Sequence, residues 1–522
     1  MQSGLQSTAS PAAQKVIAFD SAAGFFASLH QAGKTLVQSH GIWDLIHPGH
    51  ICHLEEARAL GDLLVVTLTA DEHVHKGPGR PYFSEQLRMR SLAALACVDY
   101  VVVVPFPDAV PAIECVKPQI YCRGKDYEDP NFDLSGKINE EVRAVERLGG
   151  QVRYIGALKN SSTKLLNQFF DHLGSPIRSY CNALANEYTR RDLHDAVESF
   201  RDLKLLVVGE TIFDRYSYLK VQGLTSKNRI ISGRFLSQDT QFGGALAVFR
   251  HVRQFADRVR FVSLAGTEPW VQTALRQEVA AETDGIIRDQ SVTTIVKERY
   301  VEPVAEGKEM SKLFAVNYLD PQPPPRAVLE KFKARLLQEI RGVDAVLLLD
   351  FGHGLMQPEL RQLVQESAPF LALNCQTNSN NHGFNIISRQ YQHADAFTLD
   401  EQELMLSTGR RQLDFQTELM ALSKHLGSRY SWLTRGAVET IGILDDQAPC
   451  LCPPLECEVV DTIGAGDAFF SVAALAAVRK LPISLATFLG QLAGAQAVKV
   501  VGNAHPISKP ILVQSGMALL NF

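Results

Sequence analysis

The sequence has no long apolar run and only a small excess of charge. No stretch reaches the roughly 18 apolar residues of a membrane-spanning helix, and residues 1–15 lack a basic start followed by an apolar segment. The formal net charge of the 522 residues is -5, which leaves no basic field for nucleic acid or anionic lipid. We therefore expect a cytoplasmic protein without nucleic-acid or membrane partners, in which local sites capture small anionic substrates.

Cysteine is sparse, and its pattern is not that of a disulfide framework. The nine cysteines are an odd number scattered over a long chain, which indicates a reducing compartment. Cys450, Cys452 and Cys457 lie close together, but no histidine or fourth cysteine accompanies them. Ordinary thiols are therefore favoured over a zinc site.

Apolar residues are abundant enough for large cores. They make up 46% of the chain against 21% charged residues, as in ordinary globular proteins. A chain of this length divides into two or three domains. We expect an N-terminal extension at 1–33, an α/β domain at 34–173, a helical linker at 174–202 and a second α/β domain at 203–522.

The most informative stretch of the second domain is 461–470, Asp-Thr-Ile-Gly-Ala-Gly-Asp-Ala-Phe-Phe. Gly464, Ala465 and Gly466 precede an apolar helix, so free N–H groups at its N-terminus could hold a transferring phosphoryl group. Asp467 follows, where a carboxylate could take the proton from an attacking hydroxyl. A structural helix start with an acidic residue is the alternative for a bare Gly-x-Gly-Asp. The whole string resembles the signature of the ribokinase-like carbohydrate kinases, which implies an anion hole at 464–466 and Asp467 as catalytic base.

A second informative stretch is 41–50, Gly-Ile-Trp-Asp-Leu-Ile-His-Pro-Gly-His, between a predicted buried strand and a predicted helix. His47 and His50 would lie at the helix start beside free backbone donors. Two histidines without a third ligand make a weak metal site, and two core histidines are the other alternative.

The Gly-x-x-Asp-x-x-His-x-Gly-His frame resembles the cytidylyltransferase-like nucleotidyltransferases. The resemblance implies that both histidines bind nucleotide phosphates and stabilise charge that develops at the α-phosphorus. Its motifs follow in order over residues 34–173. The further residues that it assigns are Gly41, Trp43, Asp44, Lys76, Ser162 and Thr163 for the nucleotide, and Arg123, Lys125 and Asp126 near the acceptor.

Two of these assignments have simpler alternatives. The loop with Lys76 and Arg80 suits phosphate contact, but a solvated charged loop is about as good an interpretation for Arg80. Ser162 and Thr163 begin a predicted helix at 164–172, where hydroxyls can simply be caps.

The start of the second domain, 209–216, resembles the kinase half of the bifunctional heptose-phosphate kinase/nucleotidylyltransferases. In such kinases the aspartate after the first strand holds sugar hydroxyls, and paired glycines let the sugar approach the backbone. The residues so assigned are Asp214, Gly243, Gly244, Lys297 and Arg299 for the sugar, Thr434 and Gly436 for the nucleotide, and Asp400 and Glu403 for magnesium.

The chain departs from this family at several positions. Ala247, Arg250 and His251 stand where asparagines are usual, and Asn374-Cys375-Gln376 replaces Asp-Pro-Lys. His353 replaces a lysine, Asp400 an asparagine, and the nucleotidyltransferase comes first rather than second. These changes leave the glycine loop intact, so they bear on specificity more than on activity.

We expect an α/β protein with an N-terminal Rossmann-like nucleotidyltransferase domain and a C-terminal ribokinase-like domain with a small β lid. The kinase would phosphorylate a sugar or sugar phosphate with ATP and Mg²⁺. The nucleotidyltransferase would join ATP or CTP to a sugar 1-phosphate, releasing pyrophosphate, as in an ADP-heptose synthase. An alternative is an active nucleotidyltransferase fused to a non-catalytic sugar-binding or scaffolding domain. The sugar, the choice between ATP and CTP, and assembly into a homo-oligomer stay open.

Overall fold

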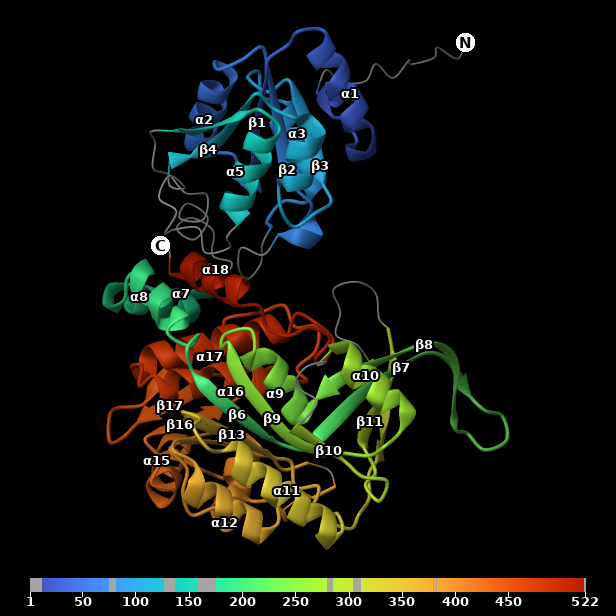
Figure 1. The fold of residues 1–522 in the computed structure, drawn as a ribbon, viewed down its shortest axis with the longest axis vertical. Helices are drawn as coiled ribbons and strands as arrows, with labels where there is room; N and C mark the ends of the chain where they lie inside the picture. The colour runs from blue at the N-terminus through green and yellow to red at the C-terminus, as the bar shows by residue number, and fades with distance from the viewer. Residues whose placement is uncertain are drawn as a thin grey trace. The chain divides into compact units, whose positions relative to one another are not determined.

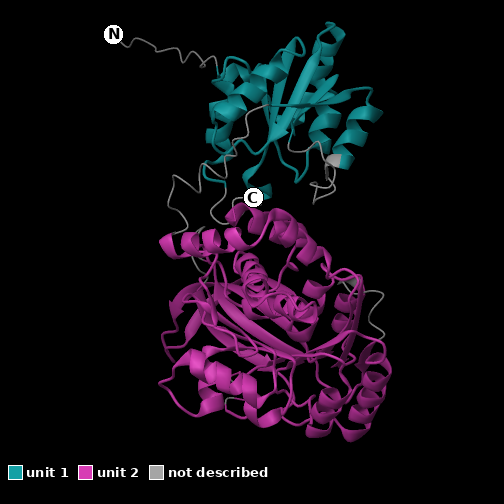
Figure 2. Cartoon of the chain, turned by 90° about the vertical axis from the view of Figure 1, so that its left-hand side faces the viewer, with its two compact units in different colours: residues 1–172, 521 teal, residues 173–520, 522 magenta. Residues whose placement is uncertain are grey.

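The computed structural model describes residues 12–74, 81–125, 137–156, 174–278, 285–303, 311–378, 380–381 and 383–520. The chain forms two compact units, which are essentially residues 1–172 and 173–520 (Figure 2). None of the described helices has both the length and the apolar character needed to span a membrane.

Unit 1 is built on a five-stranded parallel sheet of order β3-β2-β1-β4-β5. Its strands are short runs rich in β-branched and leucine residues, as expected for a sheet covered on both faces. The strands are β1 Leu36–Gly41, β2 Leu63–Thr69, β3 Tyr100–Val104, β4 Ile120–Gly124 and β5 Gln151–Ile155.

Helices cover both faces of this sheet. Leu54 and Leu92 pack on one face, with Val37 and Val66 of the strands. Phe26 packs on the other. The helices are α1 Phe19–Gln31, α2 Pro48–Arg58, α3 Glu85–Ala93, α4 Val110–Val116 and α5 Lys137–Arg147, with short 3₁₀ turns at Ala13–Lys15 and Asp71–His73.

Unit 2 is built on a nine-stranded sheet of order β10-β9-β6-β13-β14-β15-β16-β17-β18. The sheet is parallel except for its last two pairings, which are antiparallel. Its strands are β6 Lys204–Gly209, β9 Arg258–Ala265, β10 Ile286–Arg288, β13 Ala345–Asp350, β14 Leu371–Cys375, β15 Ala396–Asp400, β16 Tyr430–Thr434, β17 Thr440–Leu444 and β18 Cys450–Cys452.

A smaller four-stranded sheet, here called the lid, has the order β12-β11-β7-β8. The hairpin of β7 and β8 extends away from the main sheet (Figure 1). The lid strands are β7 Thr211–Leu224, β8 Ile231–Gly243, β11 Ile295–Glu302 and β12 Ser311–Tyr318.

The helices of unit 2 lie on both faces of the main sheet (Figure 1). One layer contains α9 Gly244–Val252, α16 Ala465–Val478 and α17 Ile483–Ala497, and the opposite layer contains α11 Arg326–Glu339, α12 Pro358–Ser367 and α15 Phe415–His425. Helix α16 is apolar on all sides and buried from Ala468 to Ala477, because other helices and the sheet surround it. Further helices of unit 2 are α10 Pro269–Glu278, α13 Ile387–Gln390, α14 Glu401–Thr408 and α18 Lys509–Leu519.

The segment expected as a linker forms two helices, α7 Gly174–Glu187 and α8 Arg190–Glu198. Both are part of unit 2. Glu198 forms an ion pair with Lys509 of α18 at 2.7 Å, and Tyr188 Oη lies 2.8 Å from Ser484 Oγ of α17. These contacts attach the segment to the unit that follows it.

Candidate active sites

A pocket of about 250 Å³ in unit 2 gathers most of the residues expected in the kinase site. It lies where the carboxyl ends of β14, β15 and β16, the lid and the N-terminus of α16 meet. Such ends of parallel strands are the usual ligand sites of α/β folds. The expected residues that line it are Asp214, Gly244, Lys297, Arg299, Asp400, Glu403, Thr434, Gly464, Gly466 and Asp467.

The glycine loop forms the N-terminus of α16. Gly464 is the N-cap with φ 84°, and a Cβ there would lie 2.2 Å from Asn503 Oδ1, so both backbone and space require glycine. A Cβ at Gly466 would meet no atom within 4 Å. Gly464 and Gly466 both line the pocket, so the N-terminus of α16 faces it, as an anion-binding site needs.

Asp467 lies in the first turn of α16. Burial, reinforced by the charge of Asp214, raises the pKa of Asp467 to about 7, although Gln376 and Lys297 act in the opposite direction. The Nε2 of Gln376 donates to Asp467 Oδ1 at 2.9 Å. A carboxylate with a pKa near neutrality is suited to general base catalysis.

Three lid residues face the pocket. Arg299 Nη1 on β11 donates to Asp214 Oδ1 on β7 at 2.5 Å. Lys297 Nζ lies 5.5 Å from the centroid of the Phe351 ring, and burial lowers the pKa of Lys297. A Cβ at Gly243 would lie 2.1 Å from Asp214 Oδ2, so the glycine leaves room for that carboxylate.

Asp400 and Glu403 form a reciprocal capping box at the start of α14. Glu403 accepts hydrogen bonds from Asp400 N–H at Oε2 and from Thr377 N–H at Oε1, both at 2.9 Å. Burial, then the charge of Asp400, raises the pKa of Glu403 to about 8. Both carboxylates line the pocket, and Glu403 also holds the backbone at Thr377 and Asp400.

The described parts of the chain contain no group of three or more His, Cys, Asp or Glu residues that could hold a metal ion. Mg²⁺ usually keeps several waters and takes one or two carboxylates together with substrate phosphates. Asp400, which lines the pocket together with Glu403, fits that donor set.

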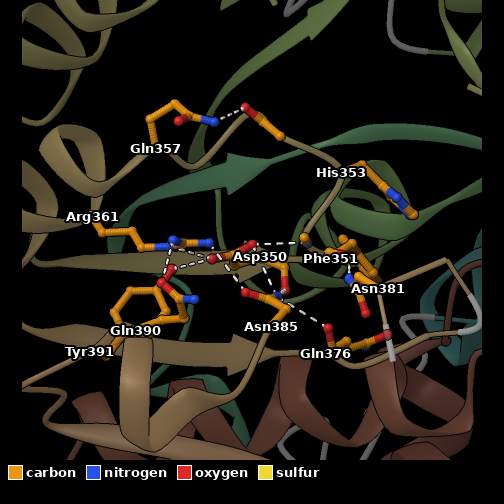
Figure 3. A network of polar contacts seen from close by, with 12 residues as sticks. Asp350, Phe351, His353, Gln357, Arg361, Gln376, Asn381, Asn385, Gln390 and Tyr391 are labelled. Atoms are coloured by element: carbon orange, nitrogen blue, oxygen red, sulfur yellow. Dashed lines mark hydrogen bonds and ion pairs between the residues drawn. The ribbon is translucent and has the colours of Figure 1, made fainter. Parts of the chain in front are cut away.

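Sequence reasoning missed a buried polar network behind the pocket, which Figure 3 shows. The Asp350 carboxylate accepts hydrogen bonds from Arg361 Nε at 2.9 Å and Tyr391 Oη at 2.7 Å. The same carboxylate accepts from Asn385 Nδ2 at 3.2 Å. The network fixes the turn after β13, which brings Phe351 to the pocket. Its only sequence signal is an aspartate at the end of an apolar strand.

The departures at 247, 250 and 251 do not line the pocket. His251 is buried and its Nδ1 accepts a hydrogen bond from Ile507 N–H at 3.1 Å. Arg250 Nη1 donates to the backbone carbonyl of Asn503 at 3.3 Å. These side chains hold the segment that contains Asn503 and Ile507.

Of the other nucleotide residues expected in this unit, Gly436 lies in the turn after β16.

In unit 1, His47 and His50 stand at the start of α2. His47 is the N-cap, and its Nδ1 accepts a hydrogen bond from Gly49 N–H at 3.1 Å. The two imidazoles stack with centroids 3.9 Å apart, and Trp43 meets His50 edge-on at 5.0 Å. Burial lowers the pKa of His47, which favours a neutral ring. Its Nε2 has no hydrogen-bond partner among the described residues.

The backbone before these histidines is held by side chains. Trp43 has φ 55°, an uncommon conformation for a large residue. Asp44 Oδ1 accepts from Tyr82 N–H at 2.7 Å and from Phe83 N–H at 3.0 Å. Arg88, which is buried and was not anticipated, donates to the carbonyl oxygens of Ile42 and Thr69. A charged residue within a helix gives no sequence signal of this role.

The expected acceptor residues are only partly described. Arg123 pairs with the buried Glu141, to which Tyr121 Oη also donates at 3.1 Å. Lys125 is exposed at the end of the β4 segment. Lys76, Asp126, Ser162 and Thr163 lie outside the described residues, as do Arg80 and the helix expected at 164–172.

Two further histidines lie at the carboxyl end of β1 and on α2. His53 Nε2 is 2.9 Å from Ser39 Oγ, and His40 Nδ1 is 3.0 Å from Thr67 Oγ1. Neither belongs to the motif from which the site was predicted. Their partners lie on adjacent strands, which a single sequence does not reveal.

Comparison with known proteins identifies both units. The model of the pfkB family of carbohydrate kinases matches residues 204–510, more than half of the chain, and the cytidylyltransferase-like model matches residues 39–172. Bifunctional protein HldE of Syntrophotalea carbinolica is 40% identical over 142 residues, 27% of this chain and 28% of that protein. HldE of Geobacter sulfurreducens is 38% identical over 151 residues, which are 28% of this chain and 29% of that protein. The chain thus matches less than a third of the length of these relatives.

Among solved structures, the match with the ribokinase of Arabidopsis thaliana complexed with ribose and ATP spans 62% of this chain and 99% of the ribokinase chain. The identity is 18% and the TM-score is 0.46. Phosphofructokinase-2 of Escherichia coli in complex with substrates and products covers 61% and 99%, with 13% identity and a TM-score of 0.47. The expected fold class and domain order are confirmed by the family matches and the two sheets. The chain belongs to the pfkB family of carbohydrate kinases and carries a cytidylyltransferase-like domain ahead of its kinase domain.

Proposed function

We propose that the protein is a cytoplasmic bifunctional enzyme of nucleotide-activated sugar biosynthesis, acting on a heptose or a similar sugar. Its small-molecule partners would be sugar phosphates and nucleoside triphosphates. The observation that carries the kinase half is Asp467, with its pKa raised to about 7, at an open helix N-terminus in a pocket that also holds Asp214, Lys297 and Arg299. The nine free cysteines accord with a reducing compartment.

In the kinase unit, Asp214 would orient the sugar, with Gly243 and Gly244 admitting it close to the backbone. Asp467 would remove the proton of the attacking hydroxyl as its oxygen bonds to the γ-phosphorus of ATP and the bond to ADP breaks. The N–H groups of 464–466 would hold the equatorial oxygens. Thr434 and Gly436 would contact the nucleotide. Mg²⁺, held by Asp400 with water and the phosphates, would neutralise phosphate charge, and Glu403 would keep Asp400 in place.

In the nucleotidyltransferase unit, a phosphate oxygen of a sugar 1-phosphate would attack the α-phosphorus of ATP or CTP and displace pyrophosphate. His47 and His50 would donate hydrogen bonds to the developing charge, because a neutral imidazole at a helix N-terminus has a donor to offer. The nucleotide would be bound by the segment that contains Gly41, Trp43 and Asp44. Lys76, Ser162 and Thr163 remain proposed phosphate contacts, and Arg123, Lys125 and Asp126 proposed acceptor-side residues.

One experiment tests both halves. The purified protein is incubated with ATP or CTP and a panel of hexose and heptose phosphates, and the products are identified by mass. A new sugar phosphate with ADP reports the kinase, and a nucleotide sugar with pyrophosphate reports the transferase. A protein that yields nucleotide sugar but no ADP with any sugar would favour the non-catalytic second domain.

A sugar that already carries a phosphate at its far end should not be converted to nucleotide sugar by this chain alone. The sequence lacks the Asp-x-Asp-x-Thr/Val string after a strand that marks aspartyl phosphatases. We therefore expect a bisphosphate to accumulate until a separate phosphatase is added. Time-resolved mass analysis checks this, and nucleotide sugar formed from a sugar 7-phosphate without added phosphatase would contradict it.

The substitution Gln376→Lys should extend kinase activity to lower pH. The neutral amide of Gln376 donates to Asp467, whose pKa is raised to about 7 chiefly by burial. An ammonium group at the same place favours the ionised carboxylate and lowers its pKa. Because the base must be ionised, wild-type kcat should fall with decreasing pH below about 7, and the variant should retain activity roughly one pH unit further down.

The pH dependence of ADP formation measures this shift. Gln362→Lys, on the exposed face of α12, is the matched control and should follow the wild type. Superimposable profiles for Gln376→Lys and the control would show that another group sets the acid limb.

A further inference from the structure

Asp461, at the start of the glycine loop, is a fully buried carboxylate. Its Oδ1 accepts a hydrogen bond from Ile463 N–H at 3.2 Å, and its Oδ2 accepts one from Gly502 N–H at 3.1 Å. These bonds tie the residues that lead into Gly464 to a second turn. A buried carboxylate is costly unless its charge is balanced, so the cation that faces Asp461 bears directly on the shape of the loop.

That cation comes from the lid. Lys312 lies on β12, and its Nζ is 2.7 Å from Asp461 Oδ1, the oxygen that also accepts from Ile463. The Lys312 side chain is 36% exposed, whereas that of Asp461 is 0% exposed. Within the described residues this is the one ion pair that Asp461 makes. Lys312 does not line the pocket, so it has no direct route to a substrate there.

A second lid strand reaches the other oxygen. Tyr216 on β7 is buried, and its Oη donates to Asp461 Oδ2 at 3.2 Å. The guanidinium of Arg299 lies 5.5 Å from the centroid of the Tyr216 ring, and Arg299 in turn bonds Asp214. Contacts therefore run continuously from the carboxylate proposed to hold the sugar to the loop proposed to hold the phosphoryl group.

We propose that Lys312 is a positioning residue of the kinase unit. By neutralising Asp461, Lys312 holds the glycine loop in the geometry that binds the phosphoryl group. Because Lys312 belongs to the lid, that geometry depends on where the lid lies. The proposal rests on the proposed kinase function. Without the lysine, the charge of Asp461 would draw in water and oppose an incoming phosphoryl group through the loop that it braces.

Lys312→Met tests the proposal, because methionine keeps an unbranched apolar stem without the charge. We expect kcat for sugar-dependent ADP formation to fall roughly ten- to a hundredfold, less than direct loss of an oxyanion donor can cost. KM for the sugar should change by no more than about twofold, since no sugar contact is removed. Lys312→Arg should recover most of kcat, and ethylammonium should partly restore Lys312→Ala.

Lys220→Met is the matched control. Lys220 lies on β7 of the same lid, where it pairs with Glu302 at 3.3 Å while 64% of its side chain is exposed. It should retain wild-type kcat and KM, because exposed ion pairs contribute little. If Lys312→Met behaves like this control, or if neither arginine nor ethylammonium restores activity, the proposal is overturned.

Binding of ADP with and without aluminium fluoride, a mimic of the transferring phosphoryl group, separates this proposal from the kinase function. The wild type should bind ADP more tightly when aluminium fluoride is present, and Lys312→Met should lose that gain while binding ADP normally. A wild type without the gain would overturn the kinase function and this proposal with it. A variant that keeps the full gain, or that loses ADP binding as well, would overturn the role of Lys312 alone.

Discussion

Asp467→Asn should abolish sugar-dependent ADP formation while leaving pyrophosphate release by the other unit at the wild-type rate. Asparagine keeps the shape of the side chain and can still accept the hydrogen bond from Gln376, but it cannot take a proton from the attacking hydroxyl. General base catalysis typically contributes about a hundred- to ten-thousandfold to rate. The transferase should be unaffected because His47 and His50 belong to a separate compact unit.

The same variant should change how stability depends on pH. The folded pKa of Asp467, about 7, lies above the ordinary aspartate value of about 3.9 that applies to the unfolded chain. Between these values the folded protein binds more protons, so the stability that Asp467 contributes is present below about pH 4 and is lost as pH rises to about 7. Asp467→Asn removes this loss. The thermal midpoint of the variant minus that of the wild type should therefore increase between about pH 4 and pH 7 and stay constant above pH 7.

Asp446→Asn, at an exposed turn position, is the control for both measurements. A loss of both activities with a lowered midpoint would mean that Asp467 is a packing or capping group. Retained kinase activity in Asp467→Asn would mean that another group accepts the proton.

The sequence predicted those parts of the fold that depend on local pattern. The strands Tyr100–Val104 and Ala345–Asp350 are short continuous apolar runs, which is the pattern that buried parallel strands show in a sequence. The glycine loop was also predicted from its residues. The structure explains the glycine at 464, because the backbone there is left-handed and a Cβ would meet Asn503.

The parts that escaped prediction are contacts between distant segments. Gln376 was recognised as an unusual residue, but only the fold brings it to Asp467, 91 positions later. Glu403 remains a predicted magnesium residue, and the sequence did not reveal its hydrogen bond from Thr377 N–H, 26 positions earlier. The pairing of Lys312 with Asp461 joins a lid strand to the glycine loop. Charge and side-chain type alone cannot assign such partners.

In unit 1, His47→Asn should suppress pyrophosphate release while leaving the fold intact. His47 has two separable roles, because its Nδ1 caps α2 whereas its Nε2 has no partner among the described residues. Asparagine is among the best N-cap residues, so it should preserve the cap, whose loss would cost about 1 kcal/mol. It cannot reproduce the donor at Nε2, and loss of one such donor typically costs a hundredfold or more in rate.

His47→Ala separates the two roles, since it removes the cap and the donor together. We expect the same loss of transferase activity as in His47→Asn but a lower thermal midpoint for unit 1.

His50→Ala should also abolish pyrophosphate release. In all three variants, ADP formation by the kinase should stay near the wild-type rate. If His47→Asn retains transferase activity while His47→Ala loses it, His47 acts as a helix cap and the charge-stabilising role falls to other residues. A joint loss of both activities without unfolding would instead indicate that the two sites are coupled.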